Sequence, residues 1–397
     1  MKKKKNENKS KRAEDIKVAV VSEPLFKHGG AEMHLKYILE AFPNNELFTA
    51  YYDKEFVEKF LPDVKIHYSF MQYLPWRDKL RQFYLLLQPL AYRSFRFKNF
   101  DAVVSLSIAF SKFVRPRKIK HINICMSPPK FLWQKQGRSL KSVEQLEGIN
   151  VPLYKFYDFF TNTFLEKIWK RWDKRAAQRC DKIAAISEVV KKRVKKYYDY
   201  DADVIYPPVE VSKIKEGKKV NRKEDWFLYL GRVETYKGVD LAIKACHRAG
   251  VPLKIAGKGD HFDAMRELVK ILNAKGLVKF LGYVTEEEKI NLLSRTKALI
   301  FPVRDEDFGI VPVEANAAGT PVIAYREGGV TETISEKNPK SGIFFDNYTI
   351  KDLAKILKNF KSEDYDPDNC RKQANNFASE IFVYKLQNYV KDALQDN

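Results

Sequence analysis

The chain has 397 residues, a formal net charge of +21 and 45% hydrophobic residues. This length accommodates two ordinary α/β domains, and the hydrophobic content excludes a wholly disordered protein. No apolar run approaches the roughly 20 residues of a membrane-spanning helix. The basic start MKKKKNENKSKR lacks the apolar stretch of a signal peptide. We therefore expect a cytoplasmic protein whose residues 1–12 form a disordered basic tail.

The positive charge is concentrated in the first half of the chain. Residues 1–215 carry +19, of which the tail carries +6, and residues 216–397 carry +2. A one-sided positive field favours an acidic partner, namely nucleic acid, an anionic membrane surface or a phosphorylated acceptor. A generally lysine-rich composition would give the same excess. The four cysteines are scattered without a C-x-x-C pair, which is typical of reduced, buried thiols.

Strands and helices alternate through the first half. A strand over residues 16–22 leads into a loop ending at Gly29 and Gly30, and then into a helix from residue 31 to 41. Further strands are expected over residues 46–50, 101–106, 121–125 and 182–186, with helices over 156–177 and 188–198. Such alternation predicts a parallel sheet covered by helices on both faces.

A second α/β unit follows a proline-containing and then charged stretch over residues 206–225, which is the best candidate for a hinge. Its expected strands are residues 226–230, 253–256, 278–281, 299–303 and 321–324, and residues 374–394 have the pattern of an amphipathic helix or helix pair. We expect domains over residues 13–208 and 209–377, with helix 378–397 packing back on the first. Ligands of such sheets bind beyond the carboxyl ends of the strands, so a cleft between two such domains is the expected site.

The most informative segment is residues 298–334, in which a buried strand leads into an acidic loop and a short helix. Glu306 and Glu314 bracket the start of this helix with seven residues between them. Pro312 suits a first helical turn, and Gly319 is placed to end the helix in a left-handed conformation. A helix N-terminus attracts phosphate, whereas carboxylates bind hydroxyls. A ligand with both groups, a nucleotide sugar, is therefore indicated.

An earlier strand of the same unit ends in Gly231-Arg232, followed by Lys237-Gly238. Glycine lets the backbone turn away from the strand end, and the two cations project where phosphates would lie. Alone this pattern is weak, because a solvated turn would explain it. Together with Glu306 and Glu314 at the end of a later strand it becomes specific.

The motifs FLYLGRVETYKGVDLAIKA, LKIAGKGD, LGYV, EDFGIVPVEANAAGTPVIA and GGVTETI resemble those of the retaining glycosyltransferases of family 4. The first half agrees through HGGAE, VVSLSIAFSKFV, RWDKRAA and VIYPPV, so the resemblance runs from about residue 16 to 389. It implies the GT-B fold, an α/β architecture of two Rossmann-like domains facing each other across a cleft. The first-half motifs look closest to the branch that transfers mannose or related sugars to polysaccharide or lipid-linked acceptors.

The resemblance also implies roles for individual residues, which it would divide among the donor's parts. Arg232 and Lys237 would hold the diphosphate and stabilise the departing nucleotide, and Glu306 would contact the donor sugar. Glu314 would bind the ribose hydroxyls, and Tyr283 would lie near the base. The loop at Gly29 and Gly30 would approach the diphosphate. The donor sugar would also be held by backbone amides around Phe308, Gly309, Ile310 and Val311. No metal or other cofactor is implied beyond the donor itself.

One position departs from the family pattern. The branch often has Cys-His-Thr-Pro, whereas this chain has Cys125-Met126-Ser127-Pro128. Methionine cannot make the strong hydrogen bonds of the histidine that faces the donor sugar. Either the donor lacks the group that histidine reads, or another residue such as His28 replaces it. A solvated loop histidine is the commoner role for a residue like His28.

Four other signals are discounted or left open. Asp305-Glu306-Asp307 spells the D-x-D metal motif of another glycosyltransferase fold, but Arg232 and Lys237 already supply positive charge. The GKGD run at residues 257–260 lacks Walker spacing and indicates a strand-to-helix turn. Residues 75–97 mix aromatics, leucines and cations, so they form either an interfacial membrane helix or an internal helix interrupted at Pro89. The KKRVKK run at residues 191–196 favours a solvated helix face.

The sequence thus predicts a hexosyltransferase that moves a sugar, with mannose from GDP-mannose as the best guess, to a glycan or lipid-linked acceptor in polysaccharide or lipopolysaccharide biosynthesis. Peripheral attachment to the inner face of the cell membrane is an open possibility. A nucleotide-sugar 2-epimerase of similar fold is an alternative enzyme, against which the spacing of Glu306 and Glu314 argues. A basic protein that binds nucleic acid or an anionic surface is the alternative from another class. No RNA- or DNA-binding signature supports nucleic acid, so none is expected as a partner.

Overall fold

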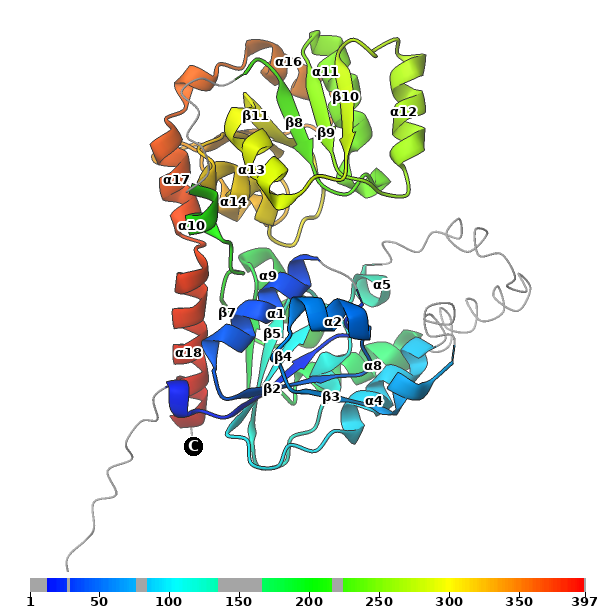
Figure 1. Ribbon diagram of the computed structural model, residues 1–397, viewed down its shortest axis with the longest axis vertical. Coiled ribbons are helices and arrows are strands. Elements are labelled where there is room, and N and C mark those ends of the chain that lie inside the picture. Colours follow the sequence, from blue (N-terminus) through cyan, green and yellow to red (C-terminus); the bar gives the residue numbers. More distant parts are fainter. Residues whose placement is uncertain (1–12, 27–28, 76–83, 135–165, 216–223, 396–397) are drawn as a thin grey trace, which may run out of the picture. The chain divides into compact units, whose positions relative to one another are not determined.

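The structure is a computed structural model that describes residues 13–26, 29–75, 84–134, 166–215 and 224–395. The expected tail over residues 1–12 and His28 lie outside the described residues. The chain divides into two compact units (Figure 1), Met1–Ile205 with Val383–Asn397, called unit 1, and Tyr206–Phe382, called unit 2. In the part of the chain that is described, no helix has the length and apolar character needed to cross a membrane.

Unit 1 is built on a seven-stranded sheet whose paired strands are all parallel. The strand order is β3-β2-β1-β4-β5-β6-β7. The strands are β1 Val18–Ser22, β2 Asn45–Thr49, β3 Ile66–Tyr68, β4 Ala102–Ser107, β5 Lys120–Cys125, β6 Lys182–Ala185 and β7 Asp203–Val204. The order reverses between β1 and β4, which is the switch point of a doubly wound sheet.

The helices of unit 1 lie between these strands in sequence, except for the last one. They are α1 Gly30–Ala41, α2 Lys54–Phe60, α4 Gln88–Ser94, α5 Lys130–Trp133, α8 Glu166–Ala177, α9 Glu188–Tyr198 and α18 Ser379–Gln395, with 3-10 turns η1 Ala13–Asp15, η2 Phe70–Tyr73, η3 Leu85–Leu87 and η4 Ser111–Phe113. Over residues 84–94 no long helix runs through Pro89, in agreement with the expected interruption. Pro89 lies in the first turn of the short helix α4, which follows the turn η3, and its missing N–H is tolerated there.

Unit 2 has a six-stranded parallel sheet in the order β10-β9-β8-β11-β12-β13. Its strands are β8 Phe227–Leu230, β9 Leu253–Ala256, β10 Val278–Gly282, β11 Ala298–Phe301, β12 Val322–Tyr325 and β13 Gly342–Phe345. Its helices are α10 Val211–Lys215, α11 Val239–Ala249, α12 Phe262–Ile271, α13 Glu286–Arg295, α14 Ile310–Ala317, α15 Val330–Thr333, α16 Ile350–Asn359 and α17 Pro367–Asn375, with 3-10 turns η6 Thr235–Lys237 and η7 Ser362–Asp364. The switch point lies between β8 and β11.

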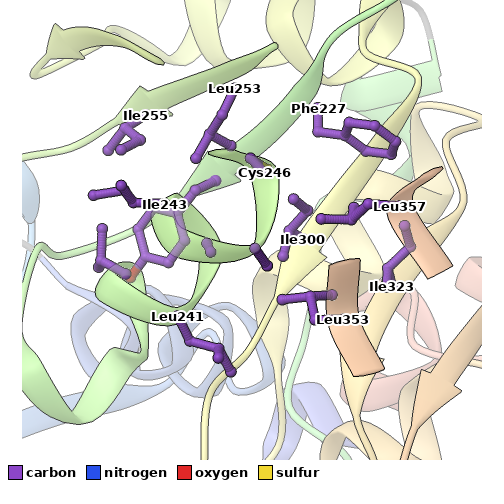
Figure 2. Close-up of a cluster of buried hydrophobic side chains, with 14 of the residues drawn as sticks. Phe227, Leu241, Ile243, Cys246, Leu253, Ile255, Ile300, Ile323, Leu353 and Leu357 are labelled. Carbon is purple, nitrogen blue, oxygen red and sulfur yellow. The ribbon is translucent and has the colours of Figure 1, made fainter. Parts of the chain in front are cut away.

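The core of unit 2 lies between one face of this sheet and helices α11 and α16 (Figure 2). Alternate residues of the strands, such as Phe227 in β8 and Ile300 in β11, meet Ile243 of α11 and Leu353 of α16. The intervening strand residues Leu228 and Leu299 are also buried, on the opposite face. Burial on both faces explains why these strands read as continuous apolar runs in the sequence.

The C-terminal segment is a helix pair, α17 and α18. The boundary between the units falls inside α18, whose first four residues belong to unit 2 and whose remainder belongs to unit 1. Within unit 1 the helix buries Leu386 and Val390. The side-chain amide of Gln387 donates to the carbonyl of Ala41 at 2.7 Å, which fixes α18 to the end of α1.

Candidate functional site

Two loops of unit 2 meet because they follow neighbouring strands of the sheet. Strand β8 pairs with β11 in parallel, with Phe227 opposite Ala298 and Leu228 opposite Leu299. Both strands therefore end at the same edge, where the strand order reverses and doubly wound sheets bind their ligands. The loop after β8 carries Arg232 and Lys237, and the loop after β11 carries Glu306.

The loop after β8 depends on glycines, because its backbone adopts a positive φ and packs closely against the turn after β9. Gly231 has φ +149°, a region that favours glycine. A Cβ on Gly257, in the turn between β9 and α12, would lie 1.9 Å from the carbonyl oxygen of Gly231. A Cβ on Gly259 would lie 2.5 Å from that of Val233. The GKGD run is thus a strand-to-helix turn, as expected, and its glycines allow close packing of two loops.

The two predicted cations emerge from this loop in different environments. The exposed Arg232 donates from Nη2 to the hydroxyl of Tyr236 at 2.9 Å. Lys237 ends the turn η6 and lies over the ring of Tyr236, with Nζ 5.2 Å from the centroid. Tyr236 therefore separates and orients the two positive groups.

Lys237 and Glu306, 69 residues apart in the chain, form an ion pair. The ammonium Nζ donates to carboxylate Oε2 at 2.6 Å, and each side chain is about one-fifth exposed. The exposed fraction leaves both groups within reach of a ligand from solvent. A cation and a hydroxyl-binding carboxylate are thus adjacent at the switch point.

The loop after β11 is fixed from the other side by the turn before α15. The amide of Gly329 donates to the carbonyl of Glu306 at 2.8 Å. A Cβ on Gly328 would lie 2.6 Å from that same carbonyl oxygen, and one on Gly329 would lie 2.5 Å from the carbonyl oxygen of Asp307. This pair of glycines lets the two backbones touch and so positions Glu306.

Helix α14 begins at Ile310 after Gly309, which has φ +102° and carries no side chain to cover the helix start. The amides of Ile310 and Val311 belong to the first turn, where helix N–H groups have no partner within the helix. Gly319 adopts φ +73°, so the predicted left-handed residue after the helix is confirmed.

Glu314 lies on α14 with a side chain only 14% exposed. Its Oε1 accepts from Nζ of Lys289 in α13 at 2.8 Å, and Lys289 also pairs with Glu286 at 2.8 Å. Burial raises the pKa of the Glu314 carboxyl, and the charge of Lys289 only partly opposes this. Burial acts to lower the pKa of Lys289, but the two carboxylates outweigh it and raise that pKa. The sequence did not single out Lys289, because its EEEK context is that of a solvated helix.

The remaining predicted residues of unit 2 differ in exposure. Tyr283 follows β10 and is 78% exposed. Strand β10 is separated from β8 by β9, so Tyr283 belongs to the same edge two strands from Arg232. Phe308 is buried, with its ring 5.7 Å from that of Tyr206 and 5.4 Å from that of Phe377. The Phe308 side chain thus anchors the loop, and only its backbone is free to meet a ligand.

In unit 1 the predicted residues again follow the carboxyl ends of strands. Gly29 precedes α1 in extended backbone and Gly30 is the first residue of that helix, in the connection after β1. Met126 directly follows β5, is half-buried, and donates its backbone N–H to the carbonyl of Ser107 at 2.9 Å. These residues lie at the carboxyl edge of their own sheet, the edge at which doubly wound sheets bind ligands. His28, the suggested replacement for the missing histidine, lies outside the described residues.

The sequence reasoning missed Glu23, which occupies the switch point of unit 1. Its Oε1 accepts from the backbone amides of Ile108, Ala109, Phe110 and Ser111 at 3.3, 2.8, 2.8 and 3.0 Å. Such a ring of amides ordinarily binds an external anion. Here the chain's own carboxylate fills it and joins the loops after β1 and β4. This role is visible only in the structure, because the Glu23 carboxylate and the amides that it binds are at least 85 residues apart in the chain.

The four cysteines are free and buried, as expected. Among the residues that the structure describes, no group of three or more His, Cys, Asp or Glu side chains is arranged to hold a metal ion. The residue at the centre of the D-x-D run, Glu306, is paired with Lys237.

Two parallel, doubly wound units that each present loops at a switch point define the GT-B class of fold. Solved structures share it. The apo lipopolysaccharide outer core galactosyltransferase WaaB aligns with TM-score 0.66 and 17% identity over 94% of this chain and 99% of that one. HepE of Anabaena, solved with UDP, aligns with TM-score 0.66 and 15% identity over 95% of this chain and 100% of that one. At these identities the likeness is one of fold.

Family models match adjoining parts of the chain. Residues 28–213 match Glycosyltransferase Family 4, and residues 210–377 match Glycosyl transferases group 1. The O-antigen chain mannosyltransferase RfbU of Salmonella typhimurium is 31% identical over 172 residues, which are 42% of this chain and 48% of that protein. The alignments span about half the length of the first curated relatives, RfbU at 48% and an uncharacterized glycosyltransferase of Methanocaldococcus jannaschii at 57%. The chain belongs to the family 4 glycosyltransferases.

Proposed function

We propose that the protein is a retaining glycosyltransferase that moves a hexose from a nucleotide-diphosphate sugar to a hydroxyl of a glycan or lipid-linked acceptor. The observation that carries this proposal is the contact of Lys237 with Glu306 at the switch point of unit 2. It joins a group that binds phosphate to a group that binds hydroxyls within one ligand's reach. Membership of the family supports the same reaction class.

In this proposal Arg232 and Lys237 hold the diphosphate, and their charge stabilises the negative charge that develops on the departing nucleotide. Glu306 turns from Lys237 to the hydroxyls of the hexose, and the amides at the start of α14 add donors. Lys289 keeps one oxygen of Glu314, so Oε2 is the atom that would accept from the ribose hydroxyls. Tyr283 would flank the base. Transfer on one face of the sugar would let the leaving phosphate assist the incoming hydroxyl.

The residue assignment is tested by Lys237→Ala and Glu306→Gln. Each should lower the transfer rate by about a hundredfold or more, the usual cost of removing one group that stabilises transition-state charge. Transfer is measured with radiolabelled donor, and circular dichroism checks that the variants fold. Lys258→Ala, which removes a cation from the neighbouring turn, serves as the matched control. Near-normal turnover of either site variant would contradict the assignment.

The donor is proposed to be GDP-mannose, and no metal is proposed to be needed because Arg232 and Lys237 supply the positive charge. A mannosyltransferase among the relatives supports the sugar. Structures of similar fold are described with UDP and UDP-glucose, which makes UDP the competing nucleotide. The departure at Met126 bears on the sugar, since a thioether cannot replace the hydrogen bonds of histidine.

A thermal-shift screen with GDP-mannose, UDP-glucose and ADP-glucose in EDTA tests both proposals. Stabilisation grows with ligand concentration relative to the dissociation constant, so the true donor should give the largest shift. GDP-mannose should stabilise the chain with the metal chelated. A larger shift with UDP-glucose would replace the proposed donor. A shift that appears only when Mn²⁺ replaces EDTA would overturn the metal-free proposal.

The acceptor is proposed to be part of polysaccharide or lipopolysaccharide biosynthesis, and the protein to work in the cytoplasm beside the inner face of the membrane. The support is the excess of +19 over residues 1–215, which would attract an anionic surface. Cell fractionation tests this location. Recovery of the protein in the soluble fraction alone at low ionic strength would count against the membrane partner.

A further inference from the structure

Four arginines gather around helices α4 and α8 of unit 1. Arg93 lies in the last turn of α4, Arg115 follows η4, Arg175 lies in the last turn of α8, and Arg179 follows that helix. The charge of Arg115 acts on both Arg93 and Arg179, and that of Arg175 acts on Arg179. The four guanidinium groups therefore form one electrostatic cluster.

The cluster lies away from the predicted substrate residues. The segment of Arg93 leads into the amino end of β4, that of Arg115 into β5, and that of Arg179 into β6. Gly30 and Met126, by contrast, follow the carboxyl ends of their strands. In Figure 1 helices α4 and α8 lie together at the side of the unit 1 sheet, and the stacking of Arg93 on Trp172 joins them.

Among the described residues, no carboxylate forms an ion pair with any of the four arginines. The Nε of Arg93 is buried without a hydrogen-bond partner. The pKa of Arg93 is lowered mainly by burial and to a smaller extent by the charge of Arg115. The pKa of Arg179 is also lowered mainly by burial, with smaller effects from the charges of Arg115 and Arg93. Holding like charges together at a partly buried donor costs free energy, which a bound anion would recover.

Exposed apolar side chains border the arginines. Leu90 on α4 is 53% exposed and Trp172 on α8 is 40% exposed. The guanidinium carbon of Arg93 lies 5.7 Å from the ring centroids of both Trp172 and Phe113. Guanidinium groups beside an exposed tryptophan and leucine match the lipid interface, where phosphates lie above acyl chains. A soluble phosphate would make no use of the apolar border.

We propose that Arg93, Arg115, Arg175 and Arg179, bordered by Leu90 and Trp172, form a binding site for the phosphate groups of anionic phospholipids. The guanidinium forks bind phosphate oxygens, and Leu90 and Trp172 enter the level of the headgroups. The site gives the proposed membrane partner a specific location. It does not depend on the identity of the sugar donor.

The test is co-sedimentation of the full chain with phosphatidylcholine vesicles, with and without phosphatidylglycerol. Wild-type protein should bind only the phosphatidylglycerol vesicles, and less as salt is raised. Each arginine near an anionic surface contributes about fivefold in affinity, so Arg93→Gln/Arg115→Gln/Arg179→Gln should bind about a hundredfold more weakly. The double variant Arg115→Gln/Arg179→Gln changes two exposed positions and should bind the vesicles about 25-fold more weakly. Because it keeps Arg93, a loss of binding in this variant would not be caused by misfolding at Arg93.

The matched control is Lys192→Gln/Lys195→Gln/Lys196→Gln, which removes three exposed charges from α9. It should lose much less affinity than the arginine triple variant. Equal losses would show that net charge alone is responsible and would overturn the site. Failure of wild-type protein to bind phosphatidylglycerol vesicles would overturn it as well.

A second measurement separates lipid from soluble phosphate. In thermal denaturation, inorganic phosphate should stabilise wild-type protein and the arginine triple variant to the same extent relative to chloride at equal ionic strength, since phosphate stabilises folded proteins without a specific site. Specific stabilisation by inorganic phosphate, lost in the arginine variant and unaccompanied by vesicle binding, would replace the lipid with a soluble phosphate ligand. The shift with the nucleotide-sugar donor should be the same in all variants, so failure of the donor proposal is distinguished from failure of this one.

Discussion

Lys289 holds the carboxylate of Glu314 from a neighbouring helix, and this contact makes the buried glutamate tolerable. Both side chains are about one-seventh exposed, so water compensates either charge poorly. The sequence predicted Glu314 through its spacing from Glu306. It could not predict Lys289, whose partner lies 25 residues away and whose neighbours are three glutamates.

Removing Lys289 should therefore destabilise the protein. Lys289→Met leaves the Glu314 carboxylate buried and unpaired, at a cost of about 3 kcal/mol in the free energy of unfolding. Glu286→Gln removes the other, 64% exposed partner and should cost less than about 1 kcal/mol. Urea unfolding measures both. Similar losses from the two variants would show that Lys289 does not support Glu314.

The loss in Lys289→Met should also depend on pH. The pKa of Glu314 is raised in the folded protein, so its carboxyl favours folding below the unfolded pKa near 4.5, and this contribution is lost as pH rises through the folded pKa. Without Lys289 the folded pKa rises further. The destabilisation should accordingly be smaller at pH 4 than at pH 8, and a loss independent of pH would contradict this account.

At the scale of elements, strands with two buried faces were predictable and short edge strands were not. Expected bounds for β8, β9 and β11 agree with the structure within two residues, because their apolar runs are bounded by glycine and charge. Strands β3, β7 and β13 were not predicted. β3 and β7 have three and two residues at sheet edges, and β13 begins with glycine after a polar loop.

The turn before α15 positions the loop that carries Glu306 through close backbone contact. Gly328→Ala would place a Cβ 2.6 Å from the Glu306 carbonyl oxygen at φ +81°, so the loop must shift. We expect a loss of about 2 kcal/mol in stability and at least tenfold weaker donor binding. Gly276→Ala is the control, since nothing lies within 4 Å of its Cβ and its φ is not positive. Scanning calorimetry measures the loss of stability, and titration calorimetry measures donor affinity. Unchanged donor affinity in Gly328→Ala would contradict a role of this turn in positioning the donor site.

At the scale of the whole molecule, two parallel α/β sheets and the family were accessible from the sequence because local motifs recur at the ends of parallel strands, whereas the order of the strands was not. Contacts between distant loops were not accessible. Glu23, for example, accepts from backbone amides more than 80 residues away in the chain. Such contacts form only when the sheet has assembled.

Unit 1 should be the acid-sensitive part of the molecule. Burial lowers the pKa of His34 to about 3, and burial, with Arg179 adding to it, lowers that of His121 to about 4. Unfolding lets both bind protons near pH 6.5, so stability is full above that pH and falls as pH drops toward 4, by about 1.4 kcal/mol per pH unit for each histidine.

Proton NMR of the six histidine rings checks this expectation. Two resonances should keep their neutral positions from pH 8 to pH 5, and His121→Asn should remove one of them. The loss of stability on acidification, followed by urea unfolding, should be shallower in that variant. Titration of all six rings near pH 6.5 would contradict the burial of these two.

The ion pair between Lys237 and Glu306 also bears on which ligands the proposed site would bind. An anion that brings only negative charge must displace the Glu306 carboxylate from Lys237 and then leave it facing a like charge. A neutral sugar must separate the same two groups without replacing the cation's partner. A molecule that offers phosphate to Lys237 and hydroxyls to Glu306 satisfies both at once. In the proposed enzyme this contact would therefore favour a ligand that carries both groups over free phosphate or free sugar.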